Sequence, residues 1–139
     1  MIRPLTLTGR KLLVIDDCEE ITRLLADMFS ACGAQVSKAN TAGEAIHLIK
    51  SESFDLVVLD LVMPDADGWE IHRFITTASP ALAEHTIFIT GDRWNNQTVS
   101  RLSAQRLPVV YKPFDLERIR KLACGLLAEE AEDTSEAPR

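Results

Sequence analysis

The chain has 139 residues, of which 46% are hydrophobic and 26% are charged, and this composition suits one globular domain with one core. Its apolar runs are short, and the first of them, Leu12–Ile15, leads directly into Asp16 and Asp17. We therefore expect neither a membrane span nor a secretory signal peptide, and we expect a cytoplasmic protein.

The net charge of −6 is unevenly distributed along the chain. Residues 129–139 hold five acidic residues and one arginine, which leaves the rest nearly neutral. The sequence therefore predicts an N-terminal extension over 1–10, a folded domain over 11–128 and an acidic, disordered tail over 129–139. The absence of a basic stripe argues against direct binding of nucleic acid.

The first half of the chain predicts three buried strands separated by two helices. The strands are 11–15, 35–38 and 56–60. Asp17 is placed to cap the first helix, which ends at Gly33, and Thr41 with Glu44 forms a capping box for the second.

The second half of the chain predicts the remaining helices and strands. Asp67 begins a helix that ends before Pro80, and strand 86–90 follows. A helix through Val99 and Leu102 has only a thin hydrophobic face. Strand 108–111 precedes a last helix capped by Asp115.

Strands that alternate with helices at this spacing predict an α/β fold, namely a doubly wound, five-stranded parallel sheet of the flavodoxin-like type. Because all strands of such a sheet point the same way, the residues that follow them lie along one edge. The residues brought to this edge would be Asp16, Asp17, Asp60, Thr90 and Lys112.

Each of these residues has an ordinary explanation when it is taken alone: a helix cap, a turn hydroxyl or a solvated charge. Together they indicate a site. Carboxylates about 5 Å apart repel one another by about 3 kcal/mol per pair at an effective dielectric constant near 20, so the cluster must bind protons or a cation. Oxygen ligands with open positions favour Mg²⁺, and a lysine and a hydroxyl facing it suit phosphoryl oxygens.

The sequence resembles the receiver domain of bacterial two-component response regulators, the CheY-like superfamily, from about Lys11 to about Leu127. The motifs that match, in chain order, are Asp16-Asp17, Asp60 followed by Met63-Pro64 and Asp67-Gly68, Thr90-Gly91, and Lys112-Pro113-Phe114. The resemblance implies the (βα)5 receiver fold and a phosphoacceptor signalling module that is not a turnover enzyme.

The resemblance also implies roles for individual residues. Asp60 would be the phosphoacceptor, and Thr90 and Lys112 would contact the phosphoryl group. Mg²⁺ would be held by Asp17 and Asp60, by Asp16 largely through water, and by the backbone carbonyl of Val62. The bond between Lys112 and Pro113 would be cis.

The partners that the resemblance implies are a sensor histidine kinase or a histidine phosphotransfer protein, which donates the phosphoryl group, and a downstream protein. A phosphorylation-dependent homodimer is one assembly that it allows. Because no output motif follows residue 127, we expect a stand-alone regulator or the receiver of a larger protein.

The sequence departs from the family pattern at two positions near the predicted site. Val109 occupies the place of a frequent aromatic residue, and Tyr111 lies on the same face of the strand. Val62 is apolar where a polar side chain could position a hydrolytic water, which predicts slow loss of the phosphoryl group.

A predicted partner surface lies on the last two strand–helix units. Its candidate residues are Val109, Tyr111, Trp94, Arg106 and Arg118, and Arg101 and Lys121 either extend it or lie on solvated helix faces.

Three alternative functions compete with a phosphorylation switch. A degenerate receiver would bind partners without phosphorylation, although all the acids and Lys112 are present. An aspartate-based phosphatase would need a second acid where Val62 stands. A flavodoxin-like cofactor carrier would need a phosphate-binding first loop in place of Asp16-Asp17-Cys18.

Overall fold

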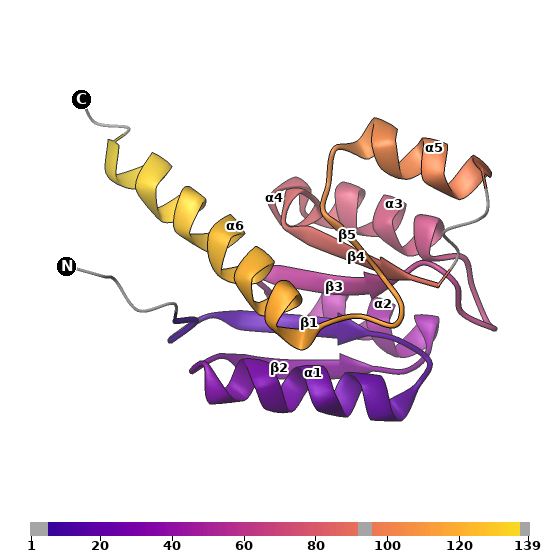
Figure 1. The fold of residues 1–139 in the computed structure, drawn as a ribbon, viewed down its shortest axis with the longest axis horizontal. Helices are drawn as coiled ribbons and strands as arrows, with labels where there is room; N and C mark the ends of the chain where they lie inside the picture. The colour runs from indigo at the N-terminus through magenta and orange to yellow at the C-terminus, as the bar shows by residue number, and fades with distance from the viewer. Residues whose placement is uncertain (1–5, 92–95, 137–139) are drawn as a thin grey trace.

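The computed structural model describes residues 6–91 and 96–136, which form a five-stranded parallel sheet with helices on both faces (Figure 1). The strand order is β2-β1-β3-β4-β5. The strands are β1 (Lys11–Ile15), β2 (Gln35–Ala39), β3 (Leu56–Asp60), β4 (Thr86–Thr90) and β5 (Val109–Tyr111). The helices are α1 (Glu19–Ala31), α2 (Ala42–Ser51), α3 (Gly68–Ala78), α4 (Pro80–Glu84), α5 (Asn96–Gln105) and α6 (Leu116–Glu136). The predicted fold class is confirmed.

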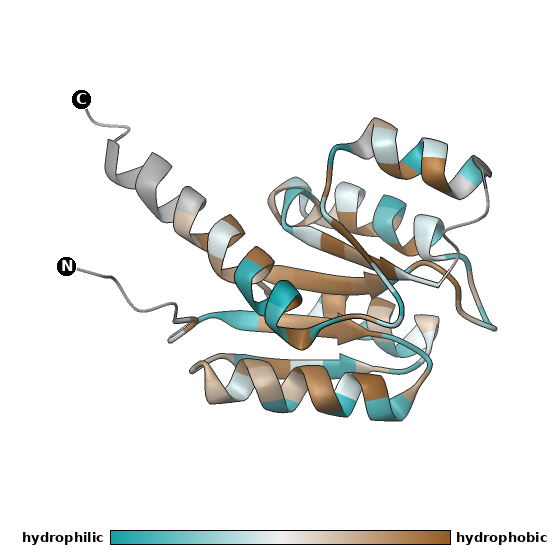
Figure 2. Ribbon diagram, in the orientation of Figure 1, coloured by the Kyte–Doolittle hydropathy of each residue, from teal (hydrophilic) through white to brown (hydrophobic). Residues whose placement is uncertain are grey.

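Alternate residues of the strands supply two hydrophobic cores, one on each face of the sheet. Leu12, Val14 and Ile87 pack with α1 and α6, whereas Leu13, Val57 and other inward residues pack with α2, α3, α4 and α5. All five residues of β3 and of β4 are buried. Figure 2 shows these central strands in the colour of hydrophobic residues. The polar ends of the two strands are therefore held by cores on both sides.

Several predicted helix ends have the expected hydrogen bonds. Thr41 Oγ1 accepts from Glu44 N at 3.1 Å, Asp67 Oδ1 from Trp69 N at 2.8 Å and Asp115 Oδ1 from Glu117 N at 2.9 Å. Gly33 has a φ of 96°, the left-handed conformation of a helix C-terminus.

The predicted cap at Asp17 is wrong. Cys18 is the N-cap residue of α1, and its side chain accepts no capping hydrogen bond. Asp17 is therefore not used at the helix end, and its carboxylate stays at the acidic cluster.

The sequence pattern does not predict helix α4, because Pro80 indicates only the end of the preceding helix. The structure places Pro80 in the first turn of a new helix, and Ser79 Oγ accepts from Leu82 N at 3.3 Å. Proline is favoured in this position because a first-turn N–H has no partner inside the helix.

Secondary structure and packing extend beyond residues 11–128 at both ends. α6 continues to Glu136, into the segment predicted to be disordered, and residues 128–132 are alanine and glutamate, which favour helix. In the N-terminal extension, Leu7 is fully buried in the core on the sheet face covered by α1 and α6, and its N–H donates to Cys32 O at 2.9 Å. The folded unit therefore begins before β1.

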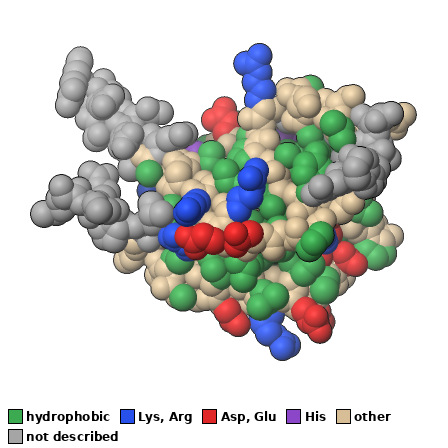
Figure 3. All heavy atoms as spheres, in the orientation of Figure 1, with side chains coloured by type: hydrophobic (Ala, Val, Ile, Leu, Met, Phe, Trp, Pro, Cys, Tyr) green, Lys and Arg blue, Asp and Glu red, His purple; other side chains and the backbone are tan. Residues whose placement is uncertain are grey.

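The face covered by α1 and α6 carries basic and acidic side chains interspersed with apolar ones (Figure 3). Among the described residues, no helix is both long enough and apolar enough to cross a bilayer.

Candidate functional site

The candidate site lies at the edge of the sheet where β1, β3, β4 and β5 end. Asp16 and Asp17 follow β1, Asp60 is the last residue of β3, Thr90 is the last residue of β4, and Lys112 follows β5. The parallel registers place these strand ends side by side, because Ile15 pairs with Leu59, Asp60 with Ile89 and Thr90 with Tyr111. The fold thus brings the predicted residues to one edge.

The three acidic residues form one cluster. One carboxylate oxygen from each of Asp16, Asp17 and Asp60 lies within 4.8 Å of the others. Asp16 and Asp60 are buried, whereas Asp17 is exposed. A cation could therefore reach the cluster from the side of Asp17.

Lys112 is the positive charge at the cluster. Its Nζ lies 2.9 Å from Asp16 Oδ2 and 3.2 Å from Asp60 Oδ2. Burial lowers the pKa of Lys112, but the hydrogen bonds and charges of Asp16 and Asp60 outweigh burial, so the pKa is raised overall. Lys112 is therefore cationic at neutral pH.

The backbone around Asp16 fixes the direction of its carboxylate. Asp16 Oδ1 accepts from Cys18 N at 2.9 Å, and Asn40 Nδ2 donates to the Asp16 carbonyl at 2.8 Å. Among the described residues, the buried Asp16 Oδ2 has no neighbouring donor other than Lys112 Nζ. A buried carboxylate oxygen with so few donors, next to other acids, fits a metal-binding site.

Asp60 carries the clearest electrostatic perturbation in the cluster. Burial and the negative charge of Asp16 raise its pKa from 3.8 to about 6, while the hydrogen bond from Val62 N and the charge of Lys112 oppose the rise. The Val62 N–H donates to Asp60 Oδ1 at 3.1 Å. Without a bound metal ion, Asp60 therefore ionises about two pH units above its ordinary range.

The space in front of Asp60 is open. A depression of about 420 Å³ is lined by Asp60, Val62, Gly91 and Lys112. The Val62 side chain is 59% exposed, which is unusual for a large hydrophobic residue in this chain. A reactant can therefore approach the carboxylate between Lys112 and an apolar wall.

The loop after Asp60 is closely packed against the end of β3. Gly68 N donates to Leu61 O at 3.0 Å, and Val62 pairs with Asp67 as an antiparallel bridge. A Cβ added to Gly68 would lie 2.6 Å from the Asp60 carbonyl oxygen. Glycine is therefore required here by the close approach of the two backbone segments.

Thr90 and Tyr111 are neighbours in the sheet. Thr90 is fully buried, and its carbonyl accepts from Lys112 N at 2.8 Å. Val109 pairs with Phe88 in the register and packs against the core that includes Leu102 of α5. The Lys112–Pro113 bond is cis, as the resemblance implied.

The residues of the predicted partner surface lie on different elements. Arg106, with a φ of 57°, follows α5, and Arg118 is exposed on α6. Trp94 lies outside the described residues. Arg101 is not simply solvated, since its guanidinium carbon lies 4.3 Å from the centroid of the Trp69 ring.

Sequence reasoning missed three residues around the site. Asn40 holds the Asp16 carbonyl, Asp65 accepts from Ala42 N at 2.7 Å, and Trp69 contacts both Arg101 and Phe88. Asn40 stands at the end of a predicted strand, which was an available signal. The other two pairings depend on the packing of α2 and α5 and had no local signal.

Residues 12–123 match the family described as the response regulator receiver domain. The chain is 28% identical to protein PilH of Pseudomonas aeruginosa over 85% of its length and 98% of that protein. It is 27% identical to the response regulator PilR of the same organism and 31% identical to the response regulator MprA of Mycolicibacterium vanbaalenii. These two matches cover 95% and 88% of the chain, which spans only 29% of PilR and 52% of MprA.

Solved structures agree with this assignment. A CheY-like receiver domain protein from Methanospirillum hungatei JF-1 has a TM-score of 0.80 and 25% identity, covering 89% of this chain and 98% of that one. A two-component response regulator from Clostridium difficile has a TM-score of 0.78 and 22% identity, with 86% and 97% covered, and supports the fold alone. The chain therefore belongs to the family of response regulator receiver domains.

Proposed function

We propose that this protein is a phosphorylation-switched signalling module in which Asp60 accepts a phosphoryl group from a phosphohistidine. The donor is a sensor histidine kinase or a histidine phosphotransfer protein. One observation carries the proposal: Lys112 Nζ lies within 3.2 Å of both buried acids, and Asp17 completes an acidic cluster beside an open approach to Asp60.

The residues of the cluster fit Mg²⁺, for which Asp16, Asp17, Asp60 and the carbonyl of Val62 are the proposed ligands. When bound, Mg²⁺ supplies positive charge that neutralises carboxylate and phosphoryl oxygens. Two features support this assignment: among the described residues the buried Asp16 Oδ2 has only Lys112 as a neighbouring donor, and the acids repel one another.

In the proposed reaction, a carboxylate oxygen of Asp60 forms a bond to phosphorus as the phosphorus–nitrogen bond of the phosphohistidine breaks. The electron pair of that bond stays on the imidazole nitrogen, so the donor leaves with an unphosphorylated histidine. Lys112 and Thr90 stabilise the phosphoryl oxygens, since such transfers depend mostly on positioning and charge. The acyl phosphate carries about −1.5 to −2 charges next to Lys112, where the ionised carboxylate carried a single negative charge.

Asp60 is suited to act as the nucleophile at neutral pH. Its pKa of about 6 in the absence of a cation leaves it mostly ionised at pH 7 to 8. Burial removes water that would otherwise solvate the carboxylate, and Lys112 compensates part of its charge.

The new charge then alters a partner surface in our proposal. Tyr111 pairs with Thr90 in the sheet, so a shift of the hydroxyl toward the phosphoryl group acts next to β5. The surface would include Val109, Tyr111, Arg106 and Arg118 together with Trp94 and would bind a downstream protein or a second copy of this chain. We place the module in the cytoplasm, where phosphohistidine donors act.

The proposal is tested by incubating the purified chain with acetyl phosphate, with and without MgCl₂, and measuring its intact mass. We expect one phosphoryl group per chain, only with Mg²⁺, and none on Asp60→Asn. A wild-type chain that gains no phosphoryl group would indicate the degenerate receiver. Repeated hydrolysis of a phosphomonoester would instead indicate an aspartate-based phosphatase.

A further inference from the structure

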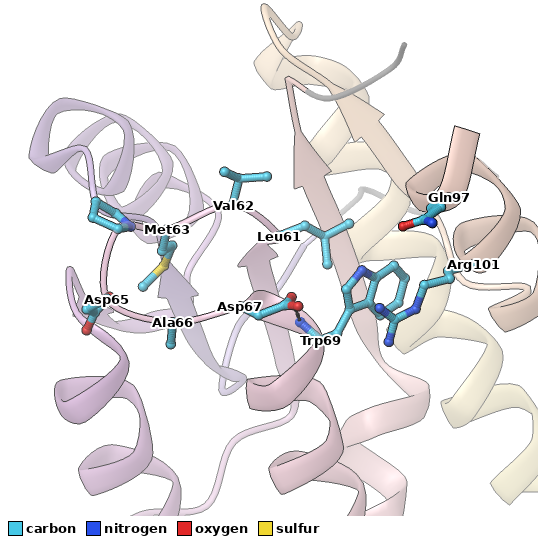
Figure 4. A pocket seen from close by; sticks show the side chains of 10 residues that line it. Leu61, Val62, Met63, Asp65, Ala66, Asp67, Trp69, Gln97 and Arg101 are labelled. Carbon is cyan, nitrogen blue, oxygen red and sulfur yellow. Dashed lines mark hydrogen bonds between the residues drawn. The ribbon is translucent and has the colours of Figure 1, made fainter. Parts of the chain in front are cut away.

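Trp69 connects three elements of the molecule (Figure 4). It lies in the first turn of α3 and is only 8% exposed. One contact is with Phe88 of β4, at a distance of 5.2 Å between ring centroids. The other is with Arg101 of α5, whose guanidinium carbon lies 4.3 Å from the centroid of the indole ring. The indole is therefore packed between a strand that ends at Thr90 and the helix that follows it.

The backbone that carries Trp69 is fixed to the end of the phosphoacceptor strand. Gly68 N donates to Leu61 O at 3.0 Å, and Trp69 N donates to Asp67 Oδ1 at 2.8 Å. Gly68 has no space for a side chain against the Asp60 carbonyl. A displacement of the peptide at Asp60 and Leu61 must therefore displace the start of α3 and the indole with it.

Helix α5 is held to the domain by few side chains. Among its residues whose burial is described, only Leu102 is buried in the core. The stack of Arg101 on Trp69 is a second attachment. Arg101 is exposed, so this is a cation–π contact at the surface, and it adds to the weak packing of a helix with a thin hydrophobic face.

There is also space for the stack to open. A cavity of about 520 Å³ lies beside the indole, with the loop after Asp60 on one side and Gln97 and Arg101 of α5 on the other. In Figure 4 the indole and the guanidinium lie against each other at the margin of this cavity, and Leu61 and Val62 line its other part. The stack therefore borders open space and not a closely packed core.

We propose that Arg101 is a positioning residue that, through its stack on Trp69, holds the loop after Asp60 and helix α5 in the unphosphorylated arrangement. The inference rests on the proposed phosphoacceptor function of Asp60. It adds that the stack is formed in the unphosphorylated state and lost when the phosphoryl group binds. By linkage, removing the stack then favours the phosphorylated arrangement and raises the affinity for a phosphoryl mimic.

The experiment uses beryllofluoride with saturating MgCl₂ on the full chain carrying Trp94→Phe, so that Trp69 is the remaining tryptophan. Bound beryllofluoride is measured by ¹⁹F NMR, and Trp69 emission is recorded in the same titration. The variants are Arg101→Gln, which removes the cation, and Arg101→Lys, which keeps it. Arg73→Gln is the matched control, because it removes an exposed arginine from α3. Urea unfolding of each variant confirms that it is folded.

We expect Arg101→Gln to bind beryllofluoride about two- to fivefold more tightly than the parent. Arg101→Lys should lie between the two, and Arg73→Gln should match the parent. The Trp69 emission of ligand-free Arg101→Gln should resemble that of the beryllofluoride-bound parent. An unchanged affinity of Arg101→Gln, or unchanged Trp69 emission when the parent binds, overturns the role of Arg101. A parent that binds no beryllofluoride with Mg²⁺ contradicts the proposed function itself.

Discussion

Asp65 accepts a hydrogen bond from the backbone N–H of Ala42 at 2.7 Å and so joins the loop after β3 to the first turn of α2. Thr41 caps the same helix through Glu44 N, so two side chains from different parts of the chain satisfy its first turn. The adjacent Asn40 holds the Asp16 carbonyl. Residues 40–42, at the start of α2, thus contact both the Asp16 backbone and the loop after Asp60.

Replacing Asp65 tests this connection. Asp65→Ala leaves the Ala42 N–H without its acceptor and should lower the free energy of unfolding by about 1 kcal/mol. Asp65→Asn retains an oxygen acceptor and should cost only a few tenths of that amount. Urea unfolding of the two variants in EDTA measures the difference, and equal losses would show that the hydrogen bond is not the stabilising feature.

Removing the charge of Asp60 should stabilise the metal-free protein at neutral pH. Because the pKa of Asp60 is raised from 3.8 to about 6 by burial and by Asp16, the folded state binds its proton more tightly than the unfolded chain. The protonated Asp60 side chain stabilises the folded state fully below about pH 4, and this stabilisation is lost as the pH rises through about 6. Asp60→Asn, which has no charge to bury, should therefore gain up to about 3 kcal/mol over the wild type above pH 7.

Urea unfolding in EDTA at pH 4 and pH 7.5 measures this gain. It should be close to zero at the lower pH, and excess MgCl₂ should reduce it at the higher pH by stabilising only the wild type. A gain of the same size at both pH values would show that the Asp60 charge is not its cause.

Val62 should govern how long the acyl phosphate lasts. Its side chain lines the depression in front of Asp60 and offers no hydrogen bond to an attacking water. Val62→Gln should accelerate hydrolysis roughly tenfold or more by positioning that water, whereas Val62→Ala should remain near the wild type. The decay of the phosphorylated mass in MgCl₂ gives both rates, and a wild-type lifetime of seconds would contradict the prediction.

Leu7 should be a core residue in energetic terms although it precedes every strand. It is fully buried among α1 and α6, so Leu7→Ala should cost about 2 to 5 kcal/mol of unfolding free energy. Leu24→Ala is the control, because Leu24 is 54% exposed and should change stability by less than about 0.5 kcal/mol. Similar losses for the two variants in urea unfolding would mean that burial of Leu7 contributes little.

The sequence was sufficient to predict the sheet and the residues at its edge. Buried strands have strong hydrophobic patterns, and the carboxyl ends of parallel strands lie at the same edge. Asp60, Thr90 and Lys112 could be placed without knowing any helix orientation. Their chemical roles stay predictions.

The remaining features depend on packing between distant segments. Pro80 begins a helix as readily as it ends one, and Leu7 is a single apolar residue in a stretch without periodicity. The stack of Arg101 on Trp69 joins residues 32 positions apart through the orientation of α5 on α3. Local patterns contain no information about such pairs, so these contacts emerged only from the structure.

The tight approach at Gly68 also limits how this protein can diversify. In a saturation mutagenesis library selected for folded protein, position 68 should be recovered almost only as glycine, since even alanine collides with the carbonyl of Asp60. Gly125, which has open space around it, should accept alanine freely. Sequence variation around the acidic cluster is thus restricted by backbone contact as well as by chemistry.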